Sequence, residues 1–102
     1  MINMEGLKNQ FQAEYERAQD YTRIINCIRI WIESDIENNL PTSEFIFWKV
    51  MYPHISEIFP KVADLLREYD IKFSAYSACD KDKDGEPVLF YKLIIHLREE
   101  ND

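Results

Sequence analysis

The chain has 102 residues, the usual size of a single domain, so we expect one domain over residues 1–102. Hydrophobic residues make up 46% of it and aromatic residues 14%, enough to bury a core without disulfides or a metal. Nineteen acidic residues against 12 basic ones give a net charge of −7, which repels nucleic acid and anionic membranes. The composition therefore disfavours direct nucleic-acid binding and favours a basic protein as partner.

The cysteines and the chain start indicate a cytoplasmic protein. Cys27 and Cys79 are far apart and form no C-x-x-C motif, which is typical of reduced thiols. The first ten residues, MINMEGLKNQ, lack the basic and apolar regions of a signal peptide. The most apolar stretch, IINCIRIWI, is too short to cross a bilayer and contains Arg29, so we expect no membrane segment.

Residues 4–36 carry apolar side chains at helical spacing, which predicts one long helix or two helices in tandem. Isoleucines are frequent in residues 22–32, so a strand there is the alternative. The apolar positions are Met4, Leu7, Phe11, Ala18, Tyr21, Ile25, Ile28 and Ile32.

The next segments predict further helices. NNLPTSE indicates a turn, after which EFIFWKVMY has Lys49 as its only polar residue following the glutamate. We interpret residues 43–52 as an aromatic central helix that Pro53 ends. Residues 54–59 would form a turn or short helix, and Pro60 suits the first position of a third helix over about 60–69.

Beyond Asp70 the apolar period changes to two, which predicts antiparallel strands over about 71–79 and 88–97. A three-residue loop of Lys83, Asp84 and Gly85 keeps the apolar residues on one face and gives Gly85 a left-handed backbone. The predicted fold is α+β: three to four helices packed on a C-terminal antiparallel hairpin, an order compatible with a winged helix. The expected strand pairs are Phe73 with Ile95, Ala75 with Leu93, and Ile71 with Leu97.

The segment DKDKDG begins like an EF-hand calcium loop, with Asp80, Asp82 and Asp84 at alternate positions before a glycine. The twelfth loop position, which needs a bidentate glutamate, is Tyr91, and the flanks read as strands. We therefore predict an acidic hairpin tip and no metal or cofactor, with weak cation binding left open.

The sequence contains no catalytic motif. His54 and His96 are the only histidines, and neither has metal-ligand spacing. A nucleophilic Cys79–His96 or Cys27–His54 pair would depend on proximity in the fold. We expect a protein that is not an enzyme, with no catalytic residues.

A winged-helix regulator that contacts DNA is an alternative, with residues 43–52 and 60–69 as its crossing helices and the hairpin as its wing. The would-be recognition helix, PKVADLLREYD, has two basic residues against three acidic ones. DNA binding depends on neutralising phosphates, so this element has the wrong charge.

Clustered acids and surplus aromatic residues indicate a protein-binding surface. Our hypothesis is a small inhibitor or regulator of a nucleic-acid-binding protein, by analogy of size and charge with anti-restriction, anti-CRISPR and antirepressor proteins of phages and mobile elements. A homodimeric accessory subunit is a further alternative. The candidate partner-binding residues are Glu33, Asp35, Glu37, Glu44, Asp82, Asp84, Glu86, Trp31 and Trp48.

Overall fold

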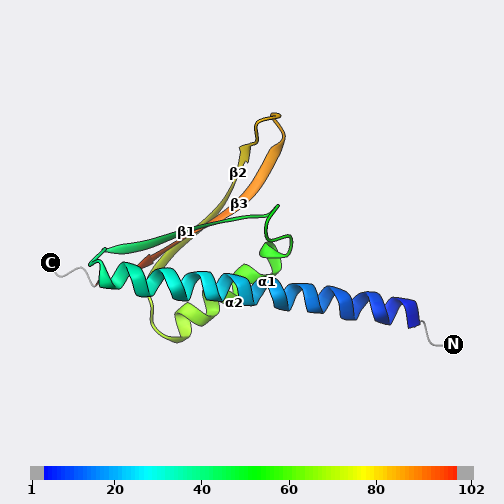
Figure 1. Ribbon diagram of the computed structural model, residues 1–102, viewed down its shortest axis with the longest axis horizontal. Helices are drawn as coiled ribbons and strands as arrows, with labels where there is room; N and C mark the ends of the chain where they lie inside the picture. The colour runs from blue at the N-terminus through cyan, green and yellow to red at the C-terminus, as the bar shows by residue number, and fades with distance from the viewer. Residues whose placement is uncertain (1–3, 99–102) are drawn as a thin grey trace.

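The computed structural model describes residues 4–98, and in that range the chain forms two helices and a three-stranded antiparallel sheet (Figure 1). The α+β class is confirmed, whereas the expected three to four helices are not found. In chain order the elements are α1 (Met4–Glu37), β1 (Thr42–Trp48), α2 (Ile55–Glu68), β2 (Phe73–Lys81) and β3 (Pro87–His96).

Helix α1 is continuous, which settles the question of one helix, two helices or a strand in this region. Its 34 residues contain no proline. The helix ends where Asn39 takes a left-handed φ of 59°. Asn39 N–H donates to the Ile36 carbonyl, and Leu40 N–H donates to the Asp35 carbonyl at 3.0 Å. These paired bonds satisfy the last carbonyls of α1 and reverse the chain toward β1.

Strand β1 replaces the predicted aromatic central helix over residues 43–52, so that prediction is wrong. Ser43, Phe45 and Phe47 are buried, whereas Glu44 and Ile46 are exposed, which is the period of two expected for a half-buried strand. Aromatic and β-branched residues favour the extended backbone, and pairing with β3 satisfies its hydrogen bonds. Pro53 lies beyond the strand, in the turn that leads to α2.

Helix α2 begins at Ile55, so the predicted third helix and the short turn before it form one helix. Pro60 therefore lies inside the helix, where its ring nitrogen cannot donate a hydrogen bond. The buried residues recur at helical spacing on both sides of Pro60, and this continuous apolar face holds the segment together. They are Ile55, Ile58, Phe59, Val62, Ala63 and Leu66.

The hairpin of β2 and β3 has the predicted register. Phe73 pairs with Ile95, and Ala75 pairs with Leu93, whereas Ile71 lies before β2 and is outside the ladder. Asp82 N–H donates to the Glu86 carbonyl at 3.0 Å and closes a three-residue loop, in which Gly85 has a φ of +80°. Both features confirm the loop expected from the sequence.

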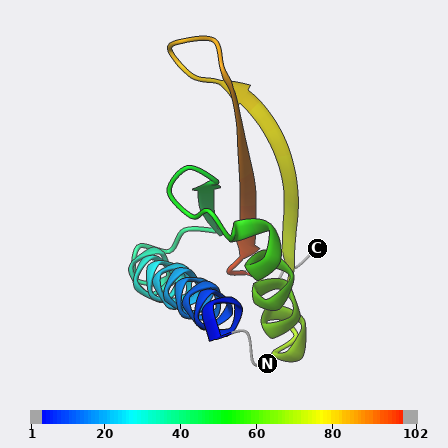
Figure 2. The ribbon, with the colours of Figure 1, turned by 90° about the vertical axis from the view of Figure 1, so that its right-hand side faces the viewer.

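The sheet order is β1-β3-β2, so β3 is central. Because β1 occupies the place of the first crossing helix, the helix pair of a winged helix is absent from residues 4–98. The hairpin continues beyond β1 and stands away from the helices (Figure 2).

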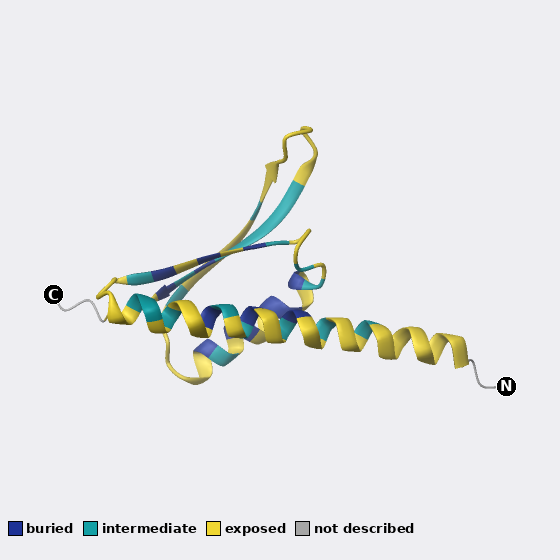
Figure 3. Cartoon of the chain, in the orientation of Figure 1, coloured by how far each residue is buried: buried dark blue, intermediate teal, exposed yellow. Residues whose placement is uncertain are grey.

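Both helices lie on the same side of the sheet, and the core fills the space between them (Figure 1). Ile24 and Ile28 of α1 and the apolar face of α2 meet the odd-numbered residues of β1 and β3. The fully buried Leu93 and Ile95 lie at its centre. No second layer covers the other face of the sheet among the described residues. Figure 3 shows that burial is confined to the middle of α1, to α2 and to the base of the sheet.

Candidate protein-binding surfaces

The uncovered side of the sheet carries a row of aromatic and aliphatic side chains, which we call the open sheet face. In an antiparallel sheet, directly paired residues point to the same side. Trp48 pairs with Phe90 on β3, and Ile46 and Tyr76 both pair with Lys92. The open sheet face consists of Glu44, Ile46, Trp48, Tyr76, Phe90, Lys92 and Ile94.

An aromatic group forms the centre of the open sheet face. The ring centroids of Trp48 and Phe90 are 5.0 Å apart, and those of Tyr76 and Phe90 are 6.4 Å apart. Tyr76 is 50% exposed and the neighbouring Ile46 is 48% exposed, whereas Trp48 and Phe90 are half-buried. The group is therefore partly accessible to another molecule. Ring contacts hold the side chains in defined positions, which lowers the entropy lost when a partner binds.

One ion pair crosses this face. Lys92 Nζ lies 3.1 Å from Glu44 Oε1. The hydrogen bond to Glu44 raises the pKa of Lys92, and the electrostatic influence of Tyr76 adds to that effect. The charge of Glu44 is therefore partly neutralised by Lys92. Glu44 adds less to the negative electrostatic field than its place in an acidic stretch of the sequence suggested.

The acidic residues at the end of α1 differ in how accessible they are. Glu33 and Glu37 are exposed on the helix surface. The half-buried Asp35 instead accepts a hydrogen bond from the Ser43 hydroxyl at 2.6 Å, which links α1 to β1. Of these three predicted residues, only Glu33 and Glu37 are available to a partner.

The acidic hairpin tip lies at the end of the projecting hairpin, far from the end of α1 (Figures 1 and 2). Asp82 Oδ1 accepts hydrogen bonds from the backbone N–H groups of Asp84 and Glu86, both at 2.9 Å. The Asp82 carboxylate thus shapes the loop, and Asp84 and Glu86 are exposed. Across residues 4–98 there is no cluster of three or more His, Cys, Asp or Glu side chains able to hold a metal ion.

Trp31 lies in a different place from Trp48. It lines a cleft of about 350 Å³ between α1 and β1. Cys27 lies in the same cleft, and burial raises the pKa of its thiol. The remaining lining residues are Glu44, Phe45, Ile46, Phe47 and Tyr52.

The structure does not bring together the cysteine–histidine pairs, Cys79–His96 and Cys27–His54, that were considered as nucleophilic pairs. Cys79 and His96 differ in parity along the hairpin and therefore point to opposite faces of the sheet. His54 Nε2 lies 3.5 Å from Glu16, and its backbone N–H donates to Asp20 at 3.3 Å. Cys27 faces the Trp31 cleft, whose lining does not include His54.

The sequence interpretation did not identify Ile46, Phe90 or Ile94 as candidate binding residues. A signal was present in VLFYKLIIH, where positions of both parities are apolar. Such a strand needs cover on both faces, and the described residues supply it on one face only.

None of the helices within residues 4–98 combines the length and the apolar character needed to cross a membrane. No protein-family model, curated protein or solved structure matches this chain.

Proposed function

We propose that this protein is a non-enzymatic protein-binding module that uses the open sheet face as its contact surface. The observation that carries the proposal is the group formed by Trp48, Phe90 and Tyr76 on a sheet face without a covering layer. Tryptophan and tyrosine are enriched among the residues that supply most of the binding energy in protein interfaces. Accessible apolar side chains bordered by polar ones are typical of such a site.

Charge favours a basic partner. The whole chain carries a net charge of −7, and the acidic hairpin tip extends from the aromatic end of the open sheet face. Such a field speeds the encounter with a positively charged protein and repels nucleic acid. An inhibitor or regulator of a nucleic-acid-binding protein is the specific form of the proposal, since those proteins present basic surfaces.

The first experiment is a pull-down with the tagged protein from native lysate, with and without nuclease and across a salt series. Retention of a basic nucleic-acid-binding protein after nuclease treatment, with release by salt, is the expected result. If every captured protein disappears with nuclease, the direct protein contact is refuted.

A matched pair of variants then assigns the surface. Trp48→Ala removes the tryptophan of the open sheet face, and Trp31→Ala removes the other tryptophan, on α1. We expect Trp48→Ala to weaken binding at least tenfold, since interface hot spots are worth about 2 kcal/mol or more. Trp31→Ala should weaken binding by no more than about threefold, because Trp31 lines a cleft that borders the open sheet face at Glu44 and Ile46 but is not part of that face. Equal losses in both variants, each still folded by circular dichroism, would refute the assignment.

A further inference from the structure

The N-terminal half of α1 carries a second accessible apolar surface, on the side of the helix away from the core. At 100° per residue its members fall within an arc of roughly 80°, and that arc is centred roughly 140° from the core-facing side. Phe11 is 65% exposed and Tyr15 is 58% exposed. We call this surface the outer stripe; it consists of Met4, Leu7, Phe11, Tyr15, Ala18 and Thr22.

The N-terminal end of α1, where this stripe begins, extends past the rest of the molecule (Figure 1). Residues 4–12 are all exposed (Figure 3). The ion pairs that join α1 to α2 and its N-terminal turn involve Glu16 and Arg17, which lie further along the helix. An isolated helix of fewer than about 12–15 residues is marginal in water. A partner helix packed on the stripe would stabilise this arm.

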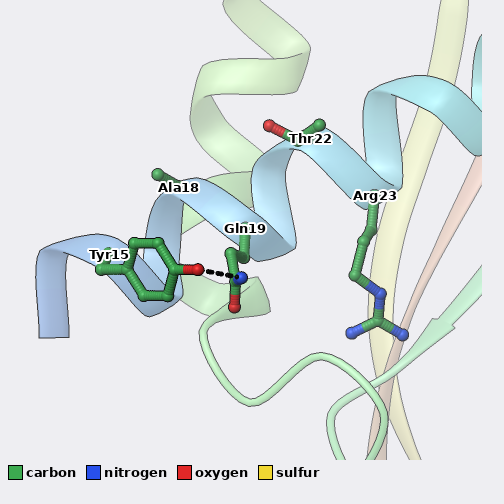
Figure 4. A pocket seen from close by; sticks show the side chains of 5 residues that line it. All are labelled: Tyr15, Ala18, Gln19, Thr22 and Arg23. Carbon is green, nitrogen blue, oxygen red and sulfur yellow. Dashed lines mark hydrogen bonds between the residues drawn. The ribbon is translucent and has the colours of Figure 1, made fainter. Parts of the chain in front are cut away.

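The outer stripe has large side chains toward the N-terminus and the small Ala18 and Thr22 at its other end, and a depression of about 430–450 Å³ lies at each end. The depression at the small-residue end, which we call the hollow, measures about 450 Å³ and is lined by Tyr15, Ala18, Gln19, Thr22 and Arg23. Figure 4 shows Gln19 donating a hydrogen bond to the Tyr15 hydroxyl, at 2.8 Å, beside the small Ala18 and Thr22. Met4, Leu7 and Phe11 border a separate depression nearer the N-terminus.

We propose that the outer stripe pairs with the outer stripe of a second copy of this chain, in antiparallel orientation. A two-fold axis near residue 13 places Phe11 against Tyr15 of the second copy. It also places Met4 and Leu7 of each copy over the small residues of the other, so each hollow is filled. A parallel pair would oppose Met4 to Met4 and the small Ala18 and Thr22 to each other, which matches the side-chain sizes less well.

Charge does not decide the orientation. Arg23 lies about 120° around the helix from the centre of the stripe, and it contacts Asp20, the Met51 carbonyl and the Tyr52 ring of its own chain. The antiparallel orientation therefore follows from the gradient of side-chain size along the stripe. A foreign helix would need to match that gradient.

The available area suits a reversible dimer. Aromatic side chains bury roughly 150–250 Å² each, so two copies of the partly exposed stripe offer on the order of 1,000 Å² in total. This is near the lower limit for specific interfaces, and we expect dissociation at roughly micromolar concentration. The core-facing side of α1 points away from the stripe, so the two protein bodies lie on opposite sides of the helix pair.

Sedimentation equilibrium of the full chain over roughly 1–100 μM tests the proposal. We expect a concentration-dependent dimer for the wild type and a monomer for Phe11→Glu, which places two carboxylates close to the two-fold axis. Ile30→Glu is the matched control, since Ile30 is an exposed apolar residue of α1 outside the stripe. A wild-type monomer at every concentration, or an unchanged dimer in Phe11→Glu, overturns the proposal.

Cross-linking tests the orientation in a background with Cys27 and Cys79 replaced by serine. Met4→Cys mixed with Thr22→Cys should yield a disulfide-linked dimer faster than either variant alone. Faster self-linking of Met4→Cys would overturn the antiparallel arrangement. The open sheet face is separate from the outer stripe, so the Trp48→Ala variant should still dimerise. If the wild type does not dimerise, only the dimer proposal fails, and the proposed protein-binding function is still judged by its own binding experiment.

Discussion

The sharpest test of the fold compares two adjacent residues of β1. Phe47 is only 2% exposed, with its ring 6.0 Å from Phe45 and edge-on to Tyr52 at 5.6 Å. Truncating a buried phenylalanine costs about 3–5 kcal/mol, from lost burial and from the cavity left behind. A domain of this size has a total stability of about 5–15 kcal/mol, so Phe47→Ala should remove much of it.

Ile46 is the matched control, because it points to the open sheet face and is 48% exposed. Ile46→Ala should cost less than about 1 kcal/mol, since its side chain is already half in water. In a helix these neighbours would differ by only about 100° in direction, whereas in a strand they point to opposite faces. The contrast between the two substitutions therefore distinguishes β1 from the helix that the sequence suggested.

Urea unfolding at 25 °C, followed by far-ultraviolet circular dichroism, measures both free energies of unfolding. Phe47→Leu provides a milder variant if Phe47→Ala is unfolded without urea, and should cost roughly 1–2 kcal/mol. Equal costs at positions 46 and 47, or a cost below about 1 kcal/mol for Phe47→Ala, would refute the arrangement of β1 on the core.

Three further predictions concern local features. Gly85 has a φ of +80°, and nothing lies within 4 Å of a Cβ added there, so only backbone strain opposes a substitution. Gly85→Ala should therefore lower the free energy of unfolding by about 1–2 kcal/mol, and Gly85→Asn should lower it by less. The buried Asp20 carboxylate accepts a hydrogen bond from the His54 backbone N–H at 3.3 Å. In urea titrations, Asp20→Ala should lower the free energy of unfolding by about 1–3 kcal/mol, because it leaves this N–H without its acceptor. Asp20→Asn keeps an acceptor and should lower it by less. Burial raises the pKa of the Cys27 thiol, so a smaller fraction of it is thiolate at neutral pH. Iodoacetamide should therefore label the exposed Cys79 before Cys27. Equal labelling rates at the two cysteines, measured by peptide mapping, would contradict this.

The hairpin was predictable because its determinants are local. Alternation in both strands and a glycine at the loop position admit only one register with a continuous apolar face, and Phe73 pairs with Ile95 as expected. Continuous α1 was foreseeable as one of the alternatives from its helical spacing. The position at which α1 ends was not predictable, because it depends on the left-handed backbone that Asn39 adopts in the folded protein.

Strand β1 was not predictable from its own residues. Phe45, Ile46, Phe47 and Trp48 are apolar at every position, so neither a helical nor a strand period is visible. The extended form is selected by β3, whose Phe90 pairs with Trp48 and lies more than 40 residues further along the chain. A contact of that separation leaves no local trace in the sequence.

The candidate site was predictable in composition but not in position. Asp35 and Glu44 belong to one acidic run in the sequence, yet Asp35 is bonded to Ser43 and Glu44 is paired with Lys92. Side-chain direction along α1 and β1 decides which acids are available, and that direction depends on the packing of α1 against the sheet.

If both proposed surfaces operate, the dimer presents two open sheet faces, and binding to a dense target gains avidity. Phe11→Glu should then leave the affinity for a single soluble target molecule within about twofold, because the open sheet face is intact. The same variant should dissociate at least tenfold faster from a surface that carries many target molecules, where the wild type binds with both copies. Surface plasmon resonance at low and high target density separates these effects. Identical dissociation of wild type and Phe11→Glu at high density would show that the outer stripe does not serve binding through the open sheet face.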